Sequence, residues 1–479
     1  MSADVLLELP EGKAKSTEQL VRALRHAISS GRLPPGSRLP PSREFAANLL
    51  VARSTVTSAY GRLVTEGLLD ARPGSGTWVR GTVSGTIAAR HLSSRRGSSD
   101  AGRGDLGTGA VGPEFSLYPG LPDLRGFPRR AWLRALQDAL ASASFWDLGY
   151  PEPGGLKQTR VVLLDYLARV RAARTSVDHL SLTSGTRSGV SCIATALRQA
   201  GHRKVAVEEP GWDGLRSVLT AAGLAVVGIP VDESGIVVRA LDEHPDVRAA
   251  LVAPAHHYPL GVRMSRDRRA ELLAWARRRD GVVLEDDYDA EFRYDGKPLG
   301  CLQSQDPDRV FLIGTMSKTL SPGVGLGWVA SPSHWTDAVR RTLAVGQEPA
   351  ALTQLAWGRF VADGAYDRHV HTARRRYRIR RASLIAALEE ALPGHRISGT
   401  AAGLHVVLHL RDGTTASAVA ADAARRGLIL EDPTPLRLDP SADHPHAEYL
   451  VLGYGNCEDR DLPQAVALLA GAVRAARRE

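Results

Sequence analysis

Cysteine is scarce in this chain: there are three, Cys192, Cys301 and Cys457, and they lie far apart in the sequence. An odd number of widely spaced cysteines argues against a disulfide framework and is typical of a reducing compartment. No apolar run approaches the roughly 20 residues that a transmembrane helix needs. The N-terminus, MSADVLLELPEGKAK, lacks the basic-then-apolar order of a signal peptide. We therefore expect a cytoplasmic protein that does not bind membranes.

The composition is that of a globular protein with more than one domain. At 479 residues the chain is too long for one ordinary core, and 43% of its residues are apolar and 24% charged. The net charge of +9 is compatible with a nucleic-acid partner. Residues 16–80 alone hold nine arginines against four acidic residues, so the excess positive charge is marked in this short segment.

Residues 81–112 divide the chain. This stretch is rich in Gly, Ser, Thr and Ala and has almost no bulky apolar residues, a composition that cannot repay the entropy of ordering. We interpret it as a flexible linker between a small basic domain at residues 1–80 and a body at residues 113–479.

The body is predicted to be an α/β domain with a mainly parallel central sheet. Its short apolar runs are nearly continuous, which is typical of strands buried on both faces of such a sheet. They are KVAVEEP, LAVVGIPV, AALVAP, GVVLEDDYD, VFLIGTM and LGWVASP. Beyond about residue 370, a long amphipathic helix and the strand-like runs LHVVLHL and YLVLGYG predict a smaller C-terminal α+β lobe. Ligands of open α/β sheets bind beyond the carboxyl ends of the strands.

The basic N-terminal segment predicts a winged helix-turn-helix. After a first amphipathic helix, QLVRALRHAISSG, Ser54 or Thr55 is expected to cap a helix with Val56, Tyr60 and Leu63 on one face. The run LLDARPGSGTWV then folds naturally as a two-stranded wing, and the second helix of such a domain can enter a major groove of DNA. A small helical packing domain is the alternative, but the exposed residues are arginines and hydroxyls.

The same segment resembles a known DNA-binding domain. The run LPPSREFAANLLVARSTVTSAYGRLVTEGLL is similar to the GntR-type domain. The resemblance implies that double-stranded DNA is contacted by Arg43, Arg53, Ser54, Thr55 and Thr57, and at the wing by Arg72 and Gly74. Thr57 stands where arginine often occurs in the recognition helix, so the bases that are read stay open.

A lysine lies between an apolar strand and a Pro/Gly loop in GTMSKTLSPGVGLGW, which suggests Schiff-base chemistry. Alone this signal is weak, because most lysines are solvated surface charges. Three other segments strengthen it. LEDDYDAEF ends another strand with acids and a tyrosine, TSGTRSGV opens a helix with a turn suited to a phosphate, and EEPGWDG places an indole where it could cover a flat ring.

Together these segments resemble aminotransferases of fold type I. With the GntR-type domain, the whole chain except the linker resembles the MocR/GabR family of transcriptional regulators. The resemblance implies pyridoxal phosphate (PLP) as cofactor, with Lys318 forming the Schiff base, Asp286 holding the pyridine nitrogen and Tyr288 the ring oxygen. It further implies a homodimer, because sites of this fold are commonly built between two subunits. The other residues that it assigns to the cofactor are Trp212 on the ring, Gly185, Thr186, Thr315 and Ser317 around the phosphate, and Tyr150, which could reach the neighbouring subunit's phosphate.

Three positions depart from the family pattern. Gly325 stands where an arginine usually clamps the phosphate, Val451 where an arginine grips an amino-acid carboxylate, and His257 where glutamine or asparagine reaches the oxygen side of the cofactor. Arg187, at the N-terminus of the predicted phosphate-binding helix, could compensate for Gly325. A solvent-facing helix arginine fits the same position equally well.

We therefore expect a ligand-responsive DNA-binding regulator that does not turn over amino acids, with PLP or an amine as the small-molecule effector bound near Lys318. Two alternatives stay open: a working aminotransferase with an accessory DNA-binding domain, and a regulator that has lost PLP. The pairs His369/His371 and His444/His446 have no third ligand at a recognisable spacing, so no metal site is expected.

Overall fold

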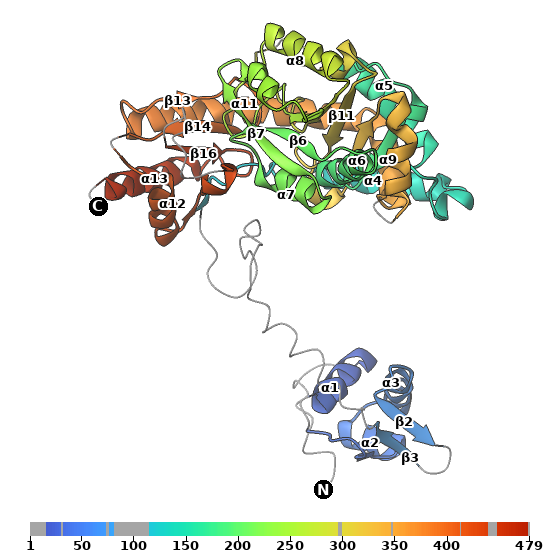
Figure 1. Cartoon of the computed structure of the whole chain (residues 1–479). Coiled ribbons are helices and arrows are strands. Elements are labelled where there is room, and N and C mark those ends of the chain that lie inside the picture. Colours follow the sequence, from blue (N-terminus) through green and yellow to red (C-terminus); the bar gives the residue numbers. More distant parts are fainter. Residues whose placement is uncertain are drawn as a thin grey trace. The chain divides into compact units, whose positions relative to one another are not determined.

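The computed structural model describes residues 16–29, 32–72, 76–80, 115–295, 299–345, 348–411, 413–438 and 448–477. These residues fall into two compact units, Met1–Ala101 and Gly102–Glu479 (Figure 1). The linker expected at residues 81–112 lies outside the described residues, so its flexibility and the domain boundaries drawn around it stay predictions. No helix in the described part of the chain has the length and apolar content needed to cross a membrane.

The first unit is a winged helix-turn-helix. Val56, Tyr60 and Leu63 are all buried, as their spacing predicts, and they share a core with Leu24 and Phe45. The wing strands pair antiparallel, and a short third strand pairs with the outer side of the second. The elements are α1 (Thr17–Ser29), β1 (Arg38–Leu39), α2 (Ser42–Leu49), α3 (Arg53–Thr65), β2 (Leu69–Arg72) and β3 (Gly76–Val79).

The start of α3 differs from the prediction that Ser54 or Thr55 caps it. The N-cap is Ala52, and no side chain caps this end, so both hydroxyl residues lie in the first turn of the helix. The chain turns earlier than expected because Leu50, which ends α2, adopts a left-handed conformation with φ 53°. The start of α3 is thus set by the conformation of the turn between α2 and α3, which the preference for hydroxyl residues at helix N-caps did not predict.

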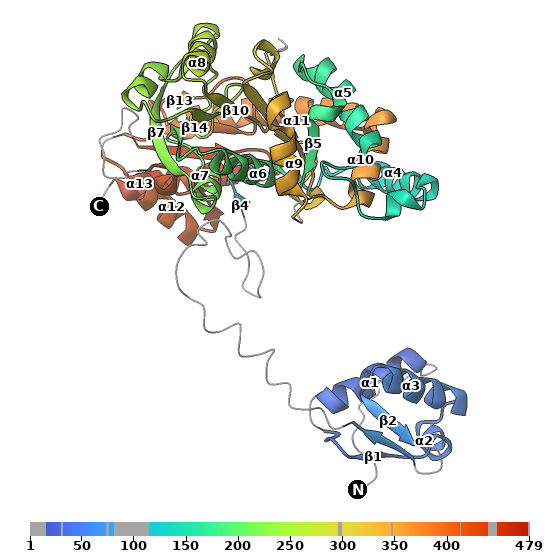
Figure 2. The ribbon, with the colours of Figure 1, turned by 45° about the vertical axis from the view of Figure 1, so that its right-hand side comes forward.

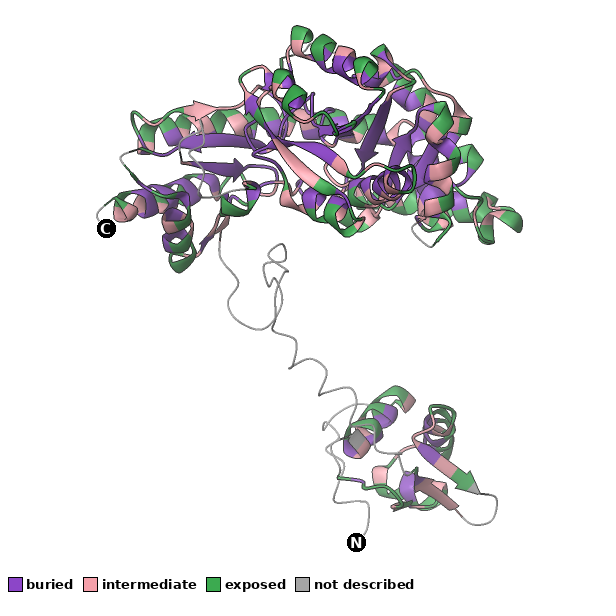
Figure 3. Ribbon diagram, in the orientation of Figure 1, coloured by how far each residue is buried: buried purple, intermediate pink, exposed green. Residues whose placement is uncertain are grey.

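The second unit is built on an eight-stranded sheet in the order β5-β12-β11-β10-β9-β6-β7-β8. All strands run parallel except β12 and the short edge strand β8, which confirms the mainly parallel sheet. Most of these strands are buried along their length (Figure 3), as their continuous apolar runs predict. Their bounds are β5 (Leu180–Thr183), β6 (Lys204–Glu209), β7 (Ala225–Asp232), β8 (Gly235–Ile236), β9 (Ala249–Val252), β10 (Val282–Asp287), β11 (Val310–Thr315) and β12 (Gly327–Ala330).

Helices cover both faces of this sheet. One core joins α6, α7 and α9 to the sheet, and a separate core joins α8 to the opposite face (Figures 1 and 2). A third core packs α5, α10 and the start of α11 around β5 and β12. The helices are α4 (Arg129–Ser142), α5 (Lys157–Arg171), α6 (Thr186–Gln199), α7 (Asp213–Ala221), α8 (Arg266–Arg278), α9 (Thr336–Leu343) and α10 (Ala351–Ala362).

A smaller α+β lobe closes the chain, as predicted. Its three-stranded antiparallel sheet, β13-β14-β16, packs with three helices around one apolar core. The short β4, which follows residue 114, pairs in parallel with β15, so the start of this unit is tied into its C-terminal lobe. The elements are β4 (Phe115–Ser116), α11 (Ala365–Ala391), β13 (Ile397–Ser398), β14 (His405–His409), α12 (Ala416–Arg425), β15 (Leu428–Ile429), β16 (Tyr449–Gly453) and α13 (Leu462–Ala476).

Candidate ligand and DNA-binding sites

Lys318 lies just beyond the carboxyl end of β11, and Asp286 lies near the same end of β10. The two strands are adjacent and parallel, with Asp286 opposite Ile313, so both residues come to one edge of the sheet. The Lys318 amine donates a hydrogen bond of 2.7 Å to the carbonyl of Gly120. We refer to the surroundings of this amine as the Lys318 site.

Three consecutive acids end β10, and the structure separates their roles. Glu285 accepts hydrogen bonds of 2.8 and 2.9 Å from two backbone amides, and Asp287 accepts bonds of 2.7 and 2.9 Å from the guanidinium of Arg171. Asp286 points to the other face, because side chains alternate along a strand. Its Oδ1 atom is buried and has no hydrogen-bond partner among the described residues. The middle acid alone is therefore left for a ligand.

Burial shifts the pKa values of Asp286 and Lys318, and in both residues it favours the neutral form. Desolvation, with repulsion from Asp287, raises the pKa of Asp286 to about 7, against the attraction of Lys318. Desolvation also lowers the pKa of Lys318, although Asp289, Asp286 and Glu431 attract its charge. The neutral amine, which is the nucleophilic form, is therefore more populated at neutral pH than in an exposed lysine.

Tyr288 belongs to a short chain of polar groups next to Asp286. Its hydroxyl lies 3.3 Å from Nδ1 of His256, which lies 2.9 Å from Oδ2 of Asp289. Of the two adjacent histidines, His256 is thus the one beside Tyr288, and sequence reasoning missed it. His257 is buried with Nε2 3.8 Å from Oε2 of Glu208, so its contact with a cofactor stays a prediction.

The predicted phosphate-binding residues come together at the N-terminus of α6. Gly185 is the N-cap and has φ 131°, a conformation that favours glycine. A Cβ atom on Gly185 would lie 3.7 Å from Oγ1 of Thr315, which donates a bond of 2.9 Å to Ser317. The hydroxyl of Thr186 is buried without a hydrogen-bond partner among the described residues. A helix N-terminus with several hydroxyls suits an anion.

The loop after Lys318 explains the glycine at position 325. Gly325 follows the single turn η6 (Pro322–Val324) and has φ 60°, where any residue with a side chain would be strained. Arg187, the residue proposed to compensate for the missing cation, is exposed in the first turn of α6. Its side chain is thus on the correct helix terminus, but its contact with a phosphate stays a prediction.

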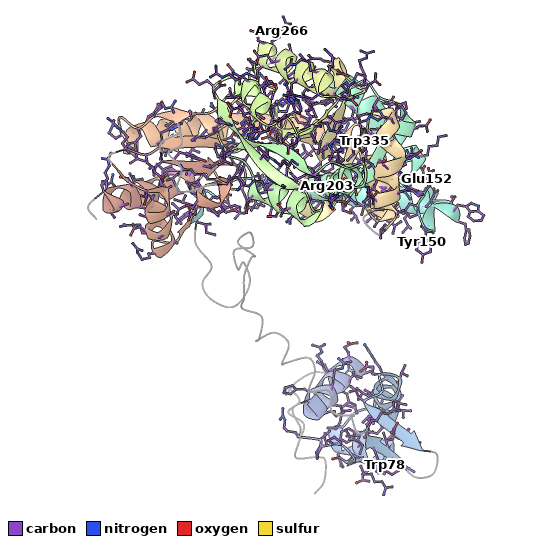
Figure 4. All side chains as sticks on the ribbon, viewed as in Figure 1. Trp78, Tyr150, Glu152, Arg203, Arg266 and Trp335 are labelled. Carbon is purple, nitrogen blue, oxygen red and sulfur yellow. The ribbon has the colours of Figure 1, made fainter. Side chains whose placement is uncertain are left out.

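The two aromatic residues predicted for the cofactor lie in different settings. Trp212 is the N-cap of α7 and is 39% exposed, with its indole packed against Gly214. Tyr150 is fully exposed at the edge of the unit (Figure 4). Nothing in the described structure tests whether it reaches a second subunit.

A further acidic group near Lys318 was missed by sequence reasoning. Glu431 accepts a hydrogen bond from the Tyr258 hydroxyl, and Tyr118 lies close enough to lower the pKa of Glu431. Burial raises the pKa of Glu431 to about 7, against the attraction of Lys318. Val451 lies instead in a buried apolar cluster with Leu260, so its position on β16 offers no polar group to a ligand.

The predicted DNA-contacting residues gather on α2 and α3. Arg43, Arg53, Ser54 and Thr57 are exposed, and Thr55 is half-buried. The two residues predicted at the wing are not fully described: Arg72 ends β2 but its side chain is not among the described ones, and Gly74 lies outside the described residues. Sequence reasoning did not single out Trp78 of the wing (Figure 4), over whose ring the guanidinium of Arg38 lies 5.7 Å from the centre.

Comparisons with known proteins match both units. Residues 16–79 match the family described as bacterial regulatory proteins, gntR family, and residues 120–450 match aminotransferase class I and II. The HTH-type pyridoxine biosynthesis transcriptional regulator PdxR of Corynebacterium glutamicum is 33% identical over 410 residues, covering 85% of this chain and 86% of its own. The chain is a MocR/GabR-family transcriptional regulator.

A second relative and the known folds agree with this assignment. The probable rhizopine catabolism regulatory protein MocR of Rhizobium meliloti is 32% identical to the regulator over 378 residues, covering 77% of this chain and 76% of its own. An archaeal alanine:glyoxylate aminotransferase superposes on 75% of the regulator and 91% of its own chain with a TM-score of 0.70. At 23% identity this likeness shows the fold alone. The fold type I architecture of the body is therefore confirmed.

Two variants of α6 can test whether Arg187 binds the phosphate in place of the arginine that is missing at Gly325. We predict that Arg187→Gln weakens PLP binding by about tenfold or more, because a charge-assisted hydrogen bond contributes roughly 1.5–3 kcal/mol. Arg198→Gln removes a charge from the last turn of the same helix and is expected to leave binding unchanged. Titration of PLP monitored by absorbance measures both. Equal affinities in the two variants would show that Arg187 does not hold the phosphate.

Proposed function

We propose that this regulator binds PLP at Lys318 and that the ligand held there sets its affinity for operator DNA. The observation that carries the proposal is the buried Oδ1 atom of Asp286, near the amine of Lys318, for which the described residues provide no hydrogen-bond partner. An orphaned buried acceptor is costly unless a ligand donor satisfies it, and the pyridinium nitrogen of PLP is such a donor. When bound, PLP supplies an aldehyde that an amine can attack and an electron-withdrawing ring.

The residues of the chain fit the other parts of the cofactor. Thr186, Thr315 and Ser317 offer hydroxyls at the N-terminus of α6 for the phosphate, and the first-turn amides of a 14-residue helix favour an anion. The Tyr288 hydroxyl, oriented by His256 and Asp289, would hold the ring oxygen. The half-exposed indole of Trp212 is available to cover the ring.

We further propose that the body is a sensor that does not transaminate amino acids. Val451 places an apolar side chain within a buried cluster where the family carries a guanidinium, so an amino-acid carboxylate has no bidentate partner at that position. The name of the Corynebacterium relative refers to pyridoxine biosynthesis, which supports PLP itself as one candidate effector. An amine that occupies the Lys318 site is the other.

We assign DNA recognition to the exposed face of α3, together with Arg43 of α2. Because no side chain caps α3, the amides of its first turn remain available to a DNA phosphate. We propose a homodimer, so that two such domains read two half-sites. An exposed apolar surface on the body supports this; its members are Leu140, Phe145, Trp146, Leu148 and Tyr150.

Replacing neighbouring acids of β10 tests the assignment of Asp286. We predict that Asp286→Asn weakens PLP binding by about tenfold or more and leaves the melting temperature of the PLP-free protein unchanged or higher, because no native hydrogen bond of Oδ1 is lost. Asp287→Asn breaks the buried ion pair with Arg171, which stabilises the fold by about 3–5 kcal/mol relative to an unpaired charge. The melting temperature of this second variant should fall. The reverse pattern would assign the ligand to Asp287.

The central experiment measures operator binding by the full chain with and without PLP, alongside the visible spectrum and turnover of an amino donor with a keto acid. A change in operator affinity together with lysine-bound PLP and no turnover is expected. Operator affinity that is identical with and without each candidate ligand would contradict the sensor role. Sustained turnover would favour the working aminotransferase instead.

A further inference from the structure

Glu431 is brought to the Lys318 site by the pairing of two short strands. β4 and β15 run parallel, with Ser116 opposite Ile429. Two residues beyond this pair, the first segment reaches Tyr118 and the second reaches Glu431. The register therefore brings Tyr118 close to the Glu431 carboxyl group, and each residue shifts the pKa of the other. Two residues after Tyr118, the carbonyl of Gly120 accepts the hydrogen bond of the Lys318 amine.

The partners of Glu431 are phenols. Tyr258, from the segment after β9, donates its hydroxyl to Glu431, and Tyr118 approaches from the segment after β4. Two buried acids of this unit are paired with guanidinium groups instead: Asp287 with Arg171, and Glu209, which lies 3.4 Å from Arg216. Glu291 is a second acid held by a phenol, because it accepts a bond of 2.8 Å from the Tyr166 hydroxyl, but it lies against Tyr166 of α5. Phenols orient a carboxyl group but carry no positive charge, so they do not neutralise it as a guanidinium does. The Glu431 subsite, which we define as Glu431, Tyr118 and Tyr258, is thus a carboxyl group oriented by neutral donors, and because burial raises its pKa to about 7, a ligand cation would favour its ionised form.

Further negative charge surrounds this subsite. Asp213, the residue after Trp212, raises the pKa of Glu431, and Asp286 and Asp289 act on Lys318 from the sheet side. Val451, buried and apolar, adds no positive charge. A ligand carboxylate would meet repulsion here, whereas a ligand cation would be attracted.

Two observations support a ligand that extends from the Lys318 site to the N-terminus of α6. The Oδ1 atom of Asp286 and the Oγ1 atom of Thr186 are each in a side chain more than nine-tenths buried, and neither has a hydrogen-bond partner among the described residues. Both atoms are accounted for by the proposed PLP. The Glu431 subsite remains without an assigned role once PLP is placed.

We infer that Glu431, held by Tyr118 and Tyr258, binds an ammonium group, and that the effector is a primary amine with a second cationic amino group and no carboxylate, such as an α,ω-diamine. This inference rests on the proposed binding of PLP at Lys318 and names the class of effector that the site takes. One amino group faces the cofactor, and the second lies on Glu431. The absence of a guanidinium at Val451 then reflects a ligand that has no carboxylate to bind.

A series of ligands with the same four-carbon chain tests this selection on the full-length, PLP-loaded protein. The ligands are 1,4-diaminobutane, butylamine, 4-aminobutan-1-ol and 4-aminobutanoate, and calorimetry measures each affinity. The diamine is expected to bind about tenfold or more tighter than butylamine, because it adds one charge-assisted hydrogen bond. The aminobutanoate is expected to bind weakest. Equal binding of the diamine and butylamine, or of the diamine and the amino alcohol, would overturn the selection of a cation.

Variants identify the group responsible. Glu431→Gln keeps the size of the side chain and is expected to abolish the preference for the diamine over butylamine while retaining the absorbance of bound PLP. Glu390→Gln removes a charge from an exposed position on α11 and is expected to keep the preference. A preference that survives in Glu431→Gln would overturn the role of this residue.

The same measurements separate this inference from the proposed function. Wild-type protein that acquires the absorbance of lysine-bound PLP but shows no preference for the diamine contradicts the inference and leaves the proposed function intact. Wild-type protein that never acquires this absorbance contradicts the proposed function, whatever the affinity for the diamine.

Discussion

Replacing Lys318 with alanine should abolish the absorbance that PLP acquires on the wild-type protein, and borohydride should then attach no PLP to the chain. The reason is that the Lys318 amine combines burial, a lowered pKa and a position beyond the end of β11, where Asp286 and Tyr288 also gather. The measurement is a visible spectrum of the purified full-length protein with added PLP, followed by reduction and mass determination of the labelled peptide. The expected effect is complete loss of the trapped adduct.

A lysine elsewhere in the same unit provides the control. Lys204, at the start of β6, is half-buried and paired with Asp246 at 2.8 Å, so Lys204→Ala should keep both the absorbance and the labelled peptide. The Lys318 variant should still bind operator DNA, because the DNA-reading residues belong to the other unit, but its affinity should no longer respond to PLP. An adduct of undiminished amount in Lys318→Ala would place the reactive amine elsewhere and contradict the proposed site.

Replacing Arg53 with alanine should weaken operator binding by about tenfold or more and reduce the slope of log affinity against log salt by about one. Arg53 is the exposed first residue of α3, at the helix end where the unit presents its uncapped amides, and its Nε lies 3.5 Å from the Ser42 hydroxyl. A guanidinium at this point can bind a DNA phosphate that also accepts hydrogen bonds from the backbone amides at the N-terminus of α3. Titration of labelled operator at several salt concentrations measures both quantities.

Arg25 supplies a matched control in the same unit. It forms an ion pair of 2.8 Å with Glu66, which follows the C-terminal end of α3. Arg25→Ala removes the same charge from the domain but at the end of α3 opposite Arg53, so the salt slope should change little. Equal losses in the two variants would mean that the net charge of the domain, rather than the position of Arg53, sets the affinity.

Much of the fold could be predicted because its signals are local and repeated. The continuous apolar runs of the central sheet predicted buried strands, and β6, β7, β9, β10, β11 and β12 all lie where those runs occur. All of these run parallel except β12, whose direction its apolar run did not reveal. The same reasoning found the wing strands, the α11 helix and strands β14 and β16. Burial on both faces requires uninterrupted apolar residues, and that requirement is visible in the sequence itself.

The details of the site were less accessible, because they depend on which way adjacent side chains point. LEDDYD presents several acids. The alternation of β10 together with Arg171 decides that, of the three acids that end the strand, Asp286 is the one with a buried oxygen, Oδ1, that has no hydrogen-bond partner in the described part of the chain. HHYP presents two histidines, and the loop sets His256 beside Tyr288 and Asp289. The cap of α3 was wrongly placed at Ser54 or Thr55, because the left-handed Leu50 moves the turn.

The sequence by itself determined the order of elements, the winged helix-turn-helix followed by a mainly parallel sheet, and the position of a lysine at the end of a buried strand. These follow from periodicity and from motifs within short segments. Only the tertiary structure decided that Glu431 and Tyr118 lie together beside Lys318. Their meeting depends on the pairing of β4 with β15 across more than 300 residues of intervening chain, and such pairing arises from packing of the whole lobe rather than from any local preference.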